Sequence, residues 1–444
     1  MAAPLIVRTA EDVAAGIQEV TVLLHDFSFR DPMEILAGQT SGKDMKAGSA
    51  MPGMSMPGDA SDLNDIEYDA YLANDRTLSD PSAVRVARGG RIRLRLINGA
   101  TSTAFWIELG SLEGTVVAVD GNPVKPLQVK RIPMAQAQRV DVILTIPPDG
   151  GSFPVLAQRE GDRRRTGIIL ATPGAAVARV PGDADEVAAA VDNSMEQRLQ
   201  ALAPLGTRGA DVVHKVELSG AMTPYAWLMD GRTWADHKPL VVTKGQRVEM
   251  EVSNRSAMAH PMHLHGHHFQ VTALNGAPLS GAVRDTVLVP ANGSARVAFD
   301  ADNPGRWLFH CHNLYHIAVG MMTEIRYDEA SLEAGTSGRS AIAGTGTTSW
   351  TSFEVGYSVH PRTLRTRPDT LPEQLASVAV PEGPEGALDV AGVGDVEDGG
   401  NSCGRPAEAD QASRPASPPW RVVEDVPEMA ASALEADLAR VTTP

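Results

Sequence analysis

Two stretches of the sequence repeat one pattern of short alternating strands. The stretch "PSAVRVARGGRIRLRLINGA" occupies residues 81–100, and "KPLVVTKGQRVEMEVSNRS" occupies residues 238–256. Each consists of a short strand, a Lys/Arg-Gly turn, an alternating strand and a closing Asn. In "RIRLRLIN" the arginines fall on one face of an extended chain, while Ile92, Leu94 and Leu96 fall on the other, as in a half-buried strand. The repeat therefore predicts two copies of one β-sandwich unit.

Composition agrees with an all-β fold of short strands, because the 444 residues include 41 Gly and 31 Pro, which are typical turn residues. We expect one sandwich domain in residues 1–175 and a second in residues 211–327. Residues 176–210 read as a linker that carries one short helix. Residues 328–444 lack sustained periodicity and are rich in Gly, Pro, Ala, Ser and acids, so we expect a largely disordered tail.

Charge and hydropathy exclude two kinds of partner. The formal net charge is −16, which argues against nucleic acid, because neutralising phosphates needs a basic surface. No apolar run approaches the roughly 18 to 20 residues that span a bilayer, so we expect no membrane span. The N-terminal segment has no basic stretch ahead of an apolar core, so we expect no signal peptide in this chain.

Two short segments concentrate the side chains that bind metals. "HPMHLHGHHFQ" (260–270) holds five of the twelve histidines, and "HCHNLYHIAVGMM" (310–322) adds three more around a cysteine. In a strand, His310 and His312 would point to one face and Cys311 to the other, so one strand could serve two metal sites. Cys311 could in principle pair with Cys403, but its place between two histidines suits metal ligation better.

The spacing after Cys311 matches one type of metal site. A blue-copper site takes two His, one Cys thiolate and a weak axial Met. His316 follows the cysteine by five residues and Met321 by ten, with Met322 as the competing methionine. The second histidine must come from elsewhere, and His260 is the candidate.

Taken together, these motifs resemble those of a known family. "HPMHLHGHHF" and "HCHNLYHIAVGM" are similar to the two C-terminal copper motifs of the multicopper oxidases, a family that includes laccases and bacterial copper-resistance oxidases. The segment "VRDTVLVPANG" between them and parts of residues 64–171 also resemble that family. The resemblance implies tandem cupredoxin-like Greek-key β-sandwich domains and a periplasmic or extracellular location.

The resemblance also implies copper cofactors and a role for each ligand. It implies that the chain oxidises a small reducing substrate in one-electron steps at the type 1 copper, with cuprous ion as the first guess and phenols as the second. Electrons would pass from Cys311 along the backbone to His310 and His312, for four-electron reduction of O2 to water. The implied ligands are His260, Cys311, His316 and Met321 for type 1 copper, His263 for type 2 copper, and His265, His310 and His312 for the type 3 pair.

The sequence holds two of the four HxH motifs that supply the eight trinuclear-cluster histidines in this family. We therefore expect a complete type 1 site and incomplete type 2 and type 3 sites, with an N-terminal cupredoxin domain missing or supplied by another subunit. A truncated or frame-shifted reading frame would explain this. A copper-binding or electron-transfer protein without oxidase turnover stays open as an alternative. A zinc hydrolase is disfavoured, because HExxH is absent and a Cys-His-Met set suits a softer metal.

Other residues near these motifs are weaker candidates. The segment "DMKAGSAMPGMSMPGD" carries four methionines, whose thioethers suit Cu(I). Either it is a loop that happens to contain methionine, or it is a Cu(I)-docking loop through Met45, Met51, Met54 and Met56. His267 and His268 fall outside the ligand pattern and are expected to support the structure. Asp236 is a candidate partner for a substrate proton or a histidine N–H.

Overall fold

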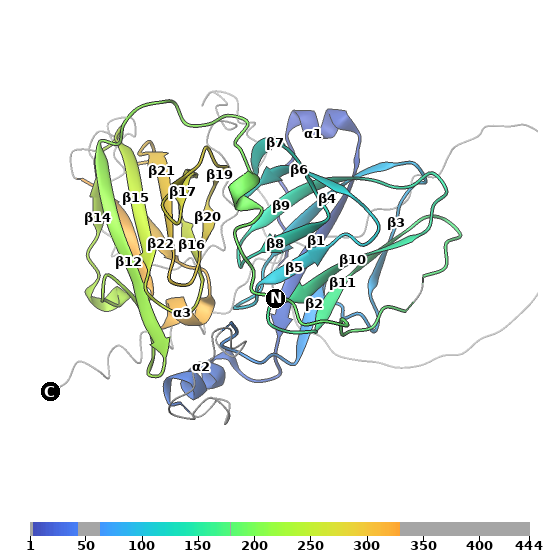
Figure 1. Ribbon diagram of the computed structural model, residues 1–444, viewed down its shortest axis with the longest axis horizontal. Helices are drawn as coiled ribbons and strands as arrows, with labels where there is room; N and C mark the ends of the chain where they lie inside the picture. The colour runs from blue at the N-terminus through green and yellow to red at the C-terminus, as the bar shows by residue number, and fades with distance from the viewer. Residues whose placement is uncertain (1–2, 43–62, 178, 329–444) are drawn as a thin grey trace, which may run out of the picture. The chain divides into compact units, whose positions relative to one another are not determined.

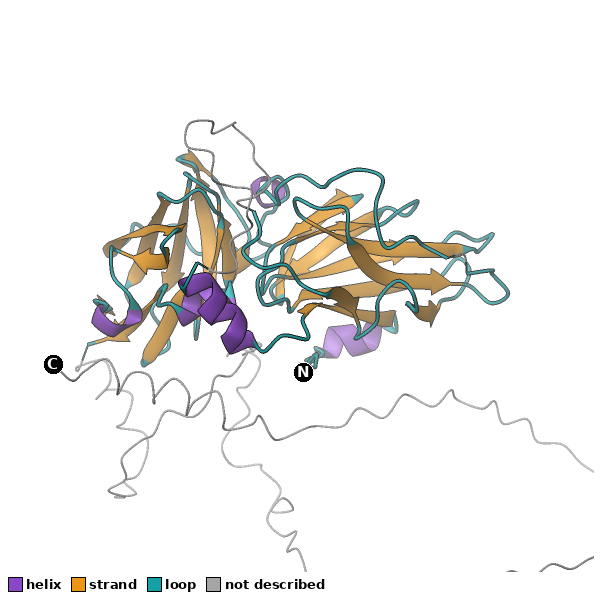
Figure 2. Cartoon of the chain, turned by 90° about the horizontal axis from the view of Figure 1, so that it is seen from below, coloured by secondary structure: helices purple, strands orange, loops and turns teal. Residues whose placement is uncertain are grey.

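A computed structural model of the chain describes residues 3–42, 63–177 and 179–328. Strands dominate this part of the chain, with only a few short helices (Figure 2). The strands form two β-sandwiches, each made of two sheets (Figure 1). In the described residues no helix is long and apolar enough to cross a membrane. The predicted disordered tail and methionine segment lie outside the described residues.

The first sandwich extends from residue 18 to residue 171. Its larger sheet has the order β2-β1-β4-β9-β6-β7, and its smaller sheet has the order β3-β11-β10-β5-β8. The bounds are β1 (Gln18–Phe27), β2 (Ala70–Ala73), β3 (Ser82–Arg85), β4 (Arg91–Asn98), β5 (Phe105–Glu108), β6 (Gly114–Val119), β7 (Asn122–Val129), β8 (Arg131–Met134), β9 (Arg139–Thr145), β10 (Ser152–Arg159) and β11 (Arg165–Ala171). The half-buried strand predicted from "RIRLRLIN" is β4, with Ile92, Leu94 and Leu96 buried.

The second sandwich contains both histidine-rich segments. Its larger sheet has the order β13-β12-β15-β21-β17-β18, with β19 beside β17, and its smaller sheet has the order β14-β23-β22-β16-β20. The bounds are β12 (Val212–Met222), β13 (Tyr225–Met229), β14 (Leu240–Val242), β15 (Arg247–Asn254), β16 (His260–Leu264), β17 (Phe269–Leu274), β18 (Ala277–Pro278), β19 (Val283–Arg284), β20 (Thr286–Val289), β21 (Ser294–Asp300), β22 (Arg306–Cys311) and β23 (Met322–Tyr327).

The two sandwiches repeat one topology, as the sequence repeat predicts. In both, the first long strand pairs in parallel with the strand that ends at the repeated Asn, β1 with β4 and β12 with β15. The repeated asparagines also make equivalent bonds. The Asn98 side-chain amide donates to the carbonyl oxygens of Thr103 and Met134, and that of Asn254 donates to those of Met258 and Val289. These bonds tie the end of one sheet to the start of the other, so the closing Asn orients the next strand in each unit.

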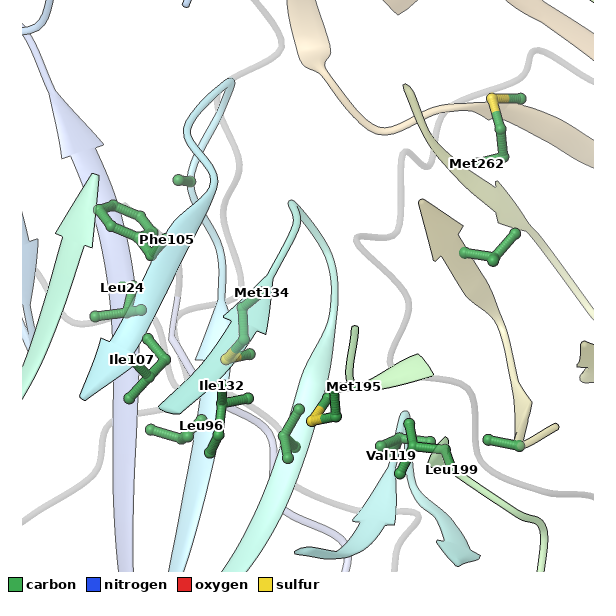
Figure 3. Packing of buried hydrophobic residues seen from close by; sticks show 14 of the residues in the cluster. Leu24, Leu96, Phe105, Ile107, Val119, Ile132, Met134, Met195, Leu199 and Met262 are labelled. Carbon is green, nitrogen blue, oxygen red and sulfur yellow. The ribbon is translucent and has the colours of Figure 1, made fainter. Parts of the chain in front are cut away.

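Buried apolar side chains fill the space between the sheets of each sandwich. Figure 3 shows part of this core, including Leu24, Leu96, Phe105 and Ile107 of the first sandwich. At roughly 25 cal/mol per Å² of buried apolar surface, such side chains supply the main favourable term for folding. In the described part of the chain, three short α-helices lie outside the strands: α1 (Ala10–Ala15), α2 (Pro32–Thr40) and α3 (Leu314–Ala318).

The segment predicted as a linker lies against the first sandwich. Among its described residues, the helical piece is a three-residue 3-10 turn at Glu196–Arg198. The carbonyl oxygen of Ala189 accepts from the Trp106 indole, and the side chains of Met195 and Leu199 are buried in the core (Figure 3). Residues 176–210 were predicted as a linker that carries one short helix, and no local pattern marks these two buried side chains, because small and polar residues surround them in the sequence.

Candidate metal centres

The two histidine-rich segments are neighbouring strands of one sheet. β16 and β22 pair antiparallel, with Met262 opposite Cys311 and His263 opposite His310. Because alternate residues face opposite sides, this pairing separates the donor side chains into two groups. We call His260, Cys311 and His316 the sulfur site, and His263, His265, His310 and His312 the histidine cluster.

The sulfur site brings three donor atoms together in the buried interior. His260 Nδ1 and His316 Nδ1 lie 3.2 Å apart, and the Cys311 Sγ lies 3.7 Å from the first and 3.5 Å from the second. All three residues are fully buried. His260 begins β16, Cys311 ends β22, and His316 lies on α3, whose N-cap is Asn313. The short helix thus turns the chain back so that His316 meets Cys311.

These distances fit a bound first-row metal ion. Bonds of ~2.0 Å to nitrogen and ~2.3 Å to sulfur, at angles between tetrahedral and trigonal, separate the donor atoms by roughly 3.3 to 3.8 Å. Two of the three measured separations fall in that range and the third, 3.2 Å, lies just below it. Two imidazoles and one thiol form the donor set of a blue-copper site, so the chemistry of the ligands fits as well.

Partners on the outer nitrogens leave both Nδ1 lone pairs available. His316 Nε2 lies 2.7 Å from Asp65 Oδ2, and His260 Nε2 lies 2.8 Å from Ser256 Oγ. Burial raises the pKa of Asp65, but His316, Tyr225 and Asn313 outweigh it, and the net pKa lies below the ordinary value. An ionised carboxylate only accepts, so His316 carries its proton on Nε2. Sequence reasoning missed Asp65, which lies 251 residues away from His316 in a different sandwich.

Two aromatic side chains of β13 enclose the sulfur site. The Trp227 ring stacks on His316, with the ring centroids 4.2 Å apart and an interplanar angle of 27°. The Tyr225 hydroxyl donates to Asp65 at 2.7 Å. Both side chains are buried, so they exclude water from the sulfur site and hold the Asp65–His316 pair in place. No local motif marks them, because β13 reads in the sequence as an ordinary apolar strand.

The histidine cluster lies further along the same two strands. His265 Nε2 and His310 Nε2 are 3.0 Å apart, and the His263 ring centroid lies 4.8 Å from that of His265 and 5.4 Å from that of His310. His312 lies beside them, with its ring 5.8 Å from His263. Its buried Nδ1 makes no hydrogen bond with any described residue. Imidazole nitrogen atoms that face one another this closely are also placed to share one metal ion.

Burial keeps most of these imidazoles neutral. It lowers the pKa of His265 to about 4 and that of His312 to about 3, with neighbouring His263 acting in the same direction. Burial likewise lowers the pKa of His310 and of His260 well below the ordinary value. Neutral imidazoles present lone pairs to a metal ion. Burial raises the pKa of the Cys311 thiol, so the thiol keeps its proton in the metal-free protein. A bound metal would displace that proton, because the thiolate is the ligand.

Gly266 lets the chain leave the cluster directly after His265. Its φ is +68°, and a Cβ there would lie 2.2 Å from the Trp307 ring. Both the left-handed backbone and the close ring exclude a side chain. The glycine of "HLHG" is therefore a structural requirement for aiming His265 at His310.

The first sandwich has no equivalent of the sulfur site in its described residues. The bonds of the two equivalent asparagines show that Phe105 of the first sandwich corresponds in position to His260 of the second. By the strand pairing, Ala157 then corresponds in position to Cys311. Both residues are apolar and buried. Only the second copy of the repeated fold carries donor atoms at this position.

The other residues proposed from the sequence as ligands or supporting groups lie in different parts of the structure. Met321 is fully buried, and its backbone bonds to both His316 and Cys311, whereas Met322 begins β23. His267 Nε2 lies 2.8 Å from the Tyr327 hydroxyl, and His268 lies near Asp285, so neither joins the cluster. Asp236 is exposed and pairs with Thr233 and Arg232. The four methionines of the candidate Cu(I) loop, Met45, Met51, Met54 and Met56, lie outside the described residues.

A cavity of about 480 Å³ lies next to the sulfur site. Both sandwiches and the segment around residue 193 line it, and its walls include Ser102, Glu160, Met258 and Asn313. Asn313 links the cavity to the site, because its backbone N–H donates to the Cys311 sulfur at 3.4 Å. The Glu160 carboxylate accepts from the backbone of Val191, and burial raises its pKa to about 7.

This raised pKa predicts a pH-dependent cost of folding. A carboxyl group with an ordinary pKa of 4.5 and a folded pKa of about 7 favours folding below pH 4.5 and loses that contribution as the pH rises through 7. We expect the difference in unfolding free energy between the Glu160→Gln variant and the unchanged protein, measured without metal, to shift in favour of the variant by about 2 kcal/mol as the pH rises from 5 to 8.5. Urea unfolding at both pH values tests this. A difference that does not vary with pH would contradict it.

Comparisons with known proteins agree with this geometry. Two family models, both described as multicopper oxidase, match residues 19–178 and 209–331, together more than half of the chain. The multicopper oxidase MmcO of Mycobacterium tuberculosis is 35% identical over 297 residues, a match that covers 67% of this chain and 57% of that protein. A copper resistance protein A homolog of Pseudomonas syringae pv. tomato is 26% identical over 362 residues, covering 62% of this chain and 60% of that protein. The chain thus spans about three fifths of the length of these relatives.

Solved structures share the fold at lower identity. The crystal structure of Fet3p, a multicopper oxidase that functions in iron import, matches with a TM-score of 0.60 and 17% identity, covering 73% of this chain and 68% of that one. The laccase from Botrytis aclada matches with a TM-score of 0.57 and 20% identity, covering 71% and 65%. These likenesses confirm the all-β, cupredoxin-like fold predicted from the sequence.

Proposed function

Because the chain belongs to the multicopper oxidase family, we propose that it takes single electrons from a small reducing substrate through a copper ion at the sulfur site. His260, Cys311 and His316 would hold this type 1 copper, with Met321 as a further, weaker ligand. His263 would hold type 2 copper, and His265, His310 and His312 would hold the type 3 pair. The observation that carries the proposal is the buried set of two Nδ1 atoms and one Sγ at 3.2 to 3.7 Å.

Bound copper would supply one-electron redox chemistry, which the family couples to the reduction of O2 to water. The chain's own residues contribute a covalent connection between the two groups of donors and a dry, hydrogen-bonded surrounding for the sulfur site. Cys311 lies between His310 and His312 in the sequence, so one stretch of backbone joins the two groups of donors. Trp227 excludes water on one side, and Asp65 keeps the Nε2 proton of His316 in place.

The cavity beside Asn313 is our proposed binding place for the reducing substrate. Its wall carries the Glu160 carboxyl group, which can accept a proton or a cation, and the Met258 residue, whose thioether is a soft group. Cuprous ion is the first candidate, and a phenol is the second. The relatives named for copper resistance favour the first, and the structural match to a laccase favours the second.

A second function is an electron-transfer or copper-binding protein that does not turn over O2. The supporting observation concerns the histidine cluster. Every histidine except His360 is described, and of these four lie in the cluster: His263, His265 and His310, whose nitrogen atoms approach within 4.8 Å of one another, and His312 beside them. A cluster of four imidazoles offers fewer nitrogens than the eight that the family resemblance implies. By the same resemblance we propose a periplasmic or extracellular location, which cell fractionation would test.

One experiment separates the two functions. The copper-loaded protein would be measured by visible absorption, by its copper content and by O2 uptake with cuprous ion or a phenol. An intense blue band together with O2 uptake supports the oxidase, and the faster substrate identifies the reductant. A blue band with about one copper and no uptake supports electron transfer. The absence of a blue band would refute the copper assignment at Cys311.

A further inference from the structure

A chain of buried charges crosses from the first sandwich to the histidine cluster. Arg284 bonds Asp120 through Nε at 2.9 Å and also pairs with Glu196. Arg139 donates hydrogen bonds to both carboxylate oxygens of Asp285, at 2.8 and 2.6 Å. Its Nη1 also lies 3.7 Å from Asp120 Oδ1. The signs therefore alternate from Glu196 to Asp285. We call these five residues the charge chain.

Stability alone does not explain the charge chain. Asp120 and Asp285 are completely buried, and Arg284 is 1% exposed. Removing charges from water costs several kcal/mol per ion, and apolar side chains of similar volume often serve at least as well. The contacts of Asp285, at one end of the charge chain, suggest that these buried charges also serve the histidine cluster.

The Asp285 end fixes which nitrogen of His263 carries a proton. His263 Nδ1 lies 3.0 Å from the Asp285 carbonyl oxygen and 3.0 Å from the Thr286 Oγ1. The Thr286 hydroxyl uses its one proton to donate to Asp285 Oδ1 at 2.9 Å. Both neighbours of His263 Nδ1 can therefore only accept, so that nitrogen donates and Nε2 keeps the free lone pair.

We propose that Arg139 of the first sandwich is a positioning residue for His263. By holding both carboxylate oxygens of Asp285, it orients the Thr286 hydroxyl and the Asp285 peptide oxygen, and these aim the Nε2 lone pair of His263 into the histidine cluster. This inference rests on the proposed copper site at that cluster. It gives the first sandwich a role in metal binding, although Arg139 contributes no ligand of its own.

A carboxylate or carbonyl partner of a ligating histidine typically contributes 10- to 100-fold to metal affinity. Arg139 donates to both carboxylate oxygens of Asp285, at 2.8 and 2.6 Å, so the carboxylate acts as an acceptor at both oxygens. Without the guanidinium, the carboxylate would turn toward other donors, and the Thr286 hydroxyl would be free to donate to His263 instead. The imidazole could then adopt the other tautomer.

The test compares Arg139→Met, Arg139→Lys and the unchanged protein. Selective ¹⁵N-histidine NMR of the metal-free protein reports the His263 tautomer, assigned with a His263→Gln variant. We expect the Nδ1–H tautomer in the unchanged protein and its loss in Arg139→Met. Copper titration followed by EPR is expected to show about 10- to 100-fold weaker non-blue copper binding in that variant, with the blue band retained. Arg139→Lys should restore part of the affinity, because lysine supplies the charge without the two-pronged geometry.

Arg95→Met is the matched control. Arg95 is a part-buried arginine of the same sandwich that pairs with Asp141 and Glu19, far along the chain from the cluster strands. The Arg95→Met variant should lower the folding stability while leaving the His263 tautomer and non-blue copper binding unchanged.

An unchanged tautomer and copper affinity in Arg139→Met would overturn the inference. Absence of non-blue copper in the unchanged protein would instead refute the proposed copper cluster, and the metal-free tautomer would still decide the role of Arg139. Should Arg139→Met fail to fold, Arg139→Lys and Asp285→Asn provide the same two readouts.

Discussion

The copper-loaded Cys311→Ser variant is expected to lose the intense visible absorption completely and to bind about one copper ion fewer. The buried thiolate is the only soft anionic donor in the sulfur site, and a serine hydroxyl does not lose its proton to a metal in the same way. His260 and His316 would remain, but without the thiolate they offer no route for electrons into the backbone between His310 and His312. Visible spectra and copper analysis of both proteins measure this.

The chain contains its own control for this substitution. Cys403 is the only other cysteine in the sequence, and the Cys403→Ser variant is expected to keep the colour and copper content of the unchanged protein. Copper at the histidine cluster should survive in both variants, because no ligand there is altered. Persistence of the blue band in Cys311→Ser would show that the proposed ligand set is wrong.

The Arg284→Met variant is expected to lose about 3 to 5 kcal/mol of folding stability, measured without metal. Its guanidinium lies between the carboxylates of Asp120 and Glu196, and Arg284 is 1% exposed. Removing it leaves two buried carboxylates without their shared partner, and each would have to be protonated or hydrated. The free energy of unfolding from urea titration at neutral pH measures the loss.

A surface arginine gives the comparison. Arg296 pairs with Glu251 at 2.7 Å, and its side chain is 45% exposed. Because water screens such a pair, Arg296→Met is expected to cost less than about 1 kcal/mol. Equal stability of the Arg284 and Arg296 variants would mean that the buried pairs contribute no more than surface ones, and the account of the charge chain would fail.

Much of the fold could be predicted because its signals are local. The alternation in "RIRLRLIN" marks β4, and the repeated Asn marks where β4 and β15 end. The ligand candidates were recognisable for the same reason, since His310, Cys311 and His312 are consecutive and strand geometry alone sends them to opposite faces. The predicted membership of the multicopper oxidase family, which rested on these motifs, is confirmed by the two matching family models.

What the sequence by itself determined is therefore the strand pattern, the repeat and the donor atoms that lie within a few residues of each other. Only the tertiary structure decided which side chains hold those donors in place. Asp65 meets His316 across 251 positions, and Arg139 meets Asp285 across 146. A hydrogen bond acts over about 3 Å in space and leaves no periodic trace along the chain, so such partners emerge only when the two sandwiches pack together.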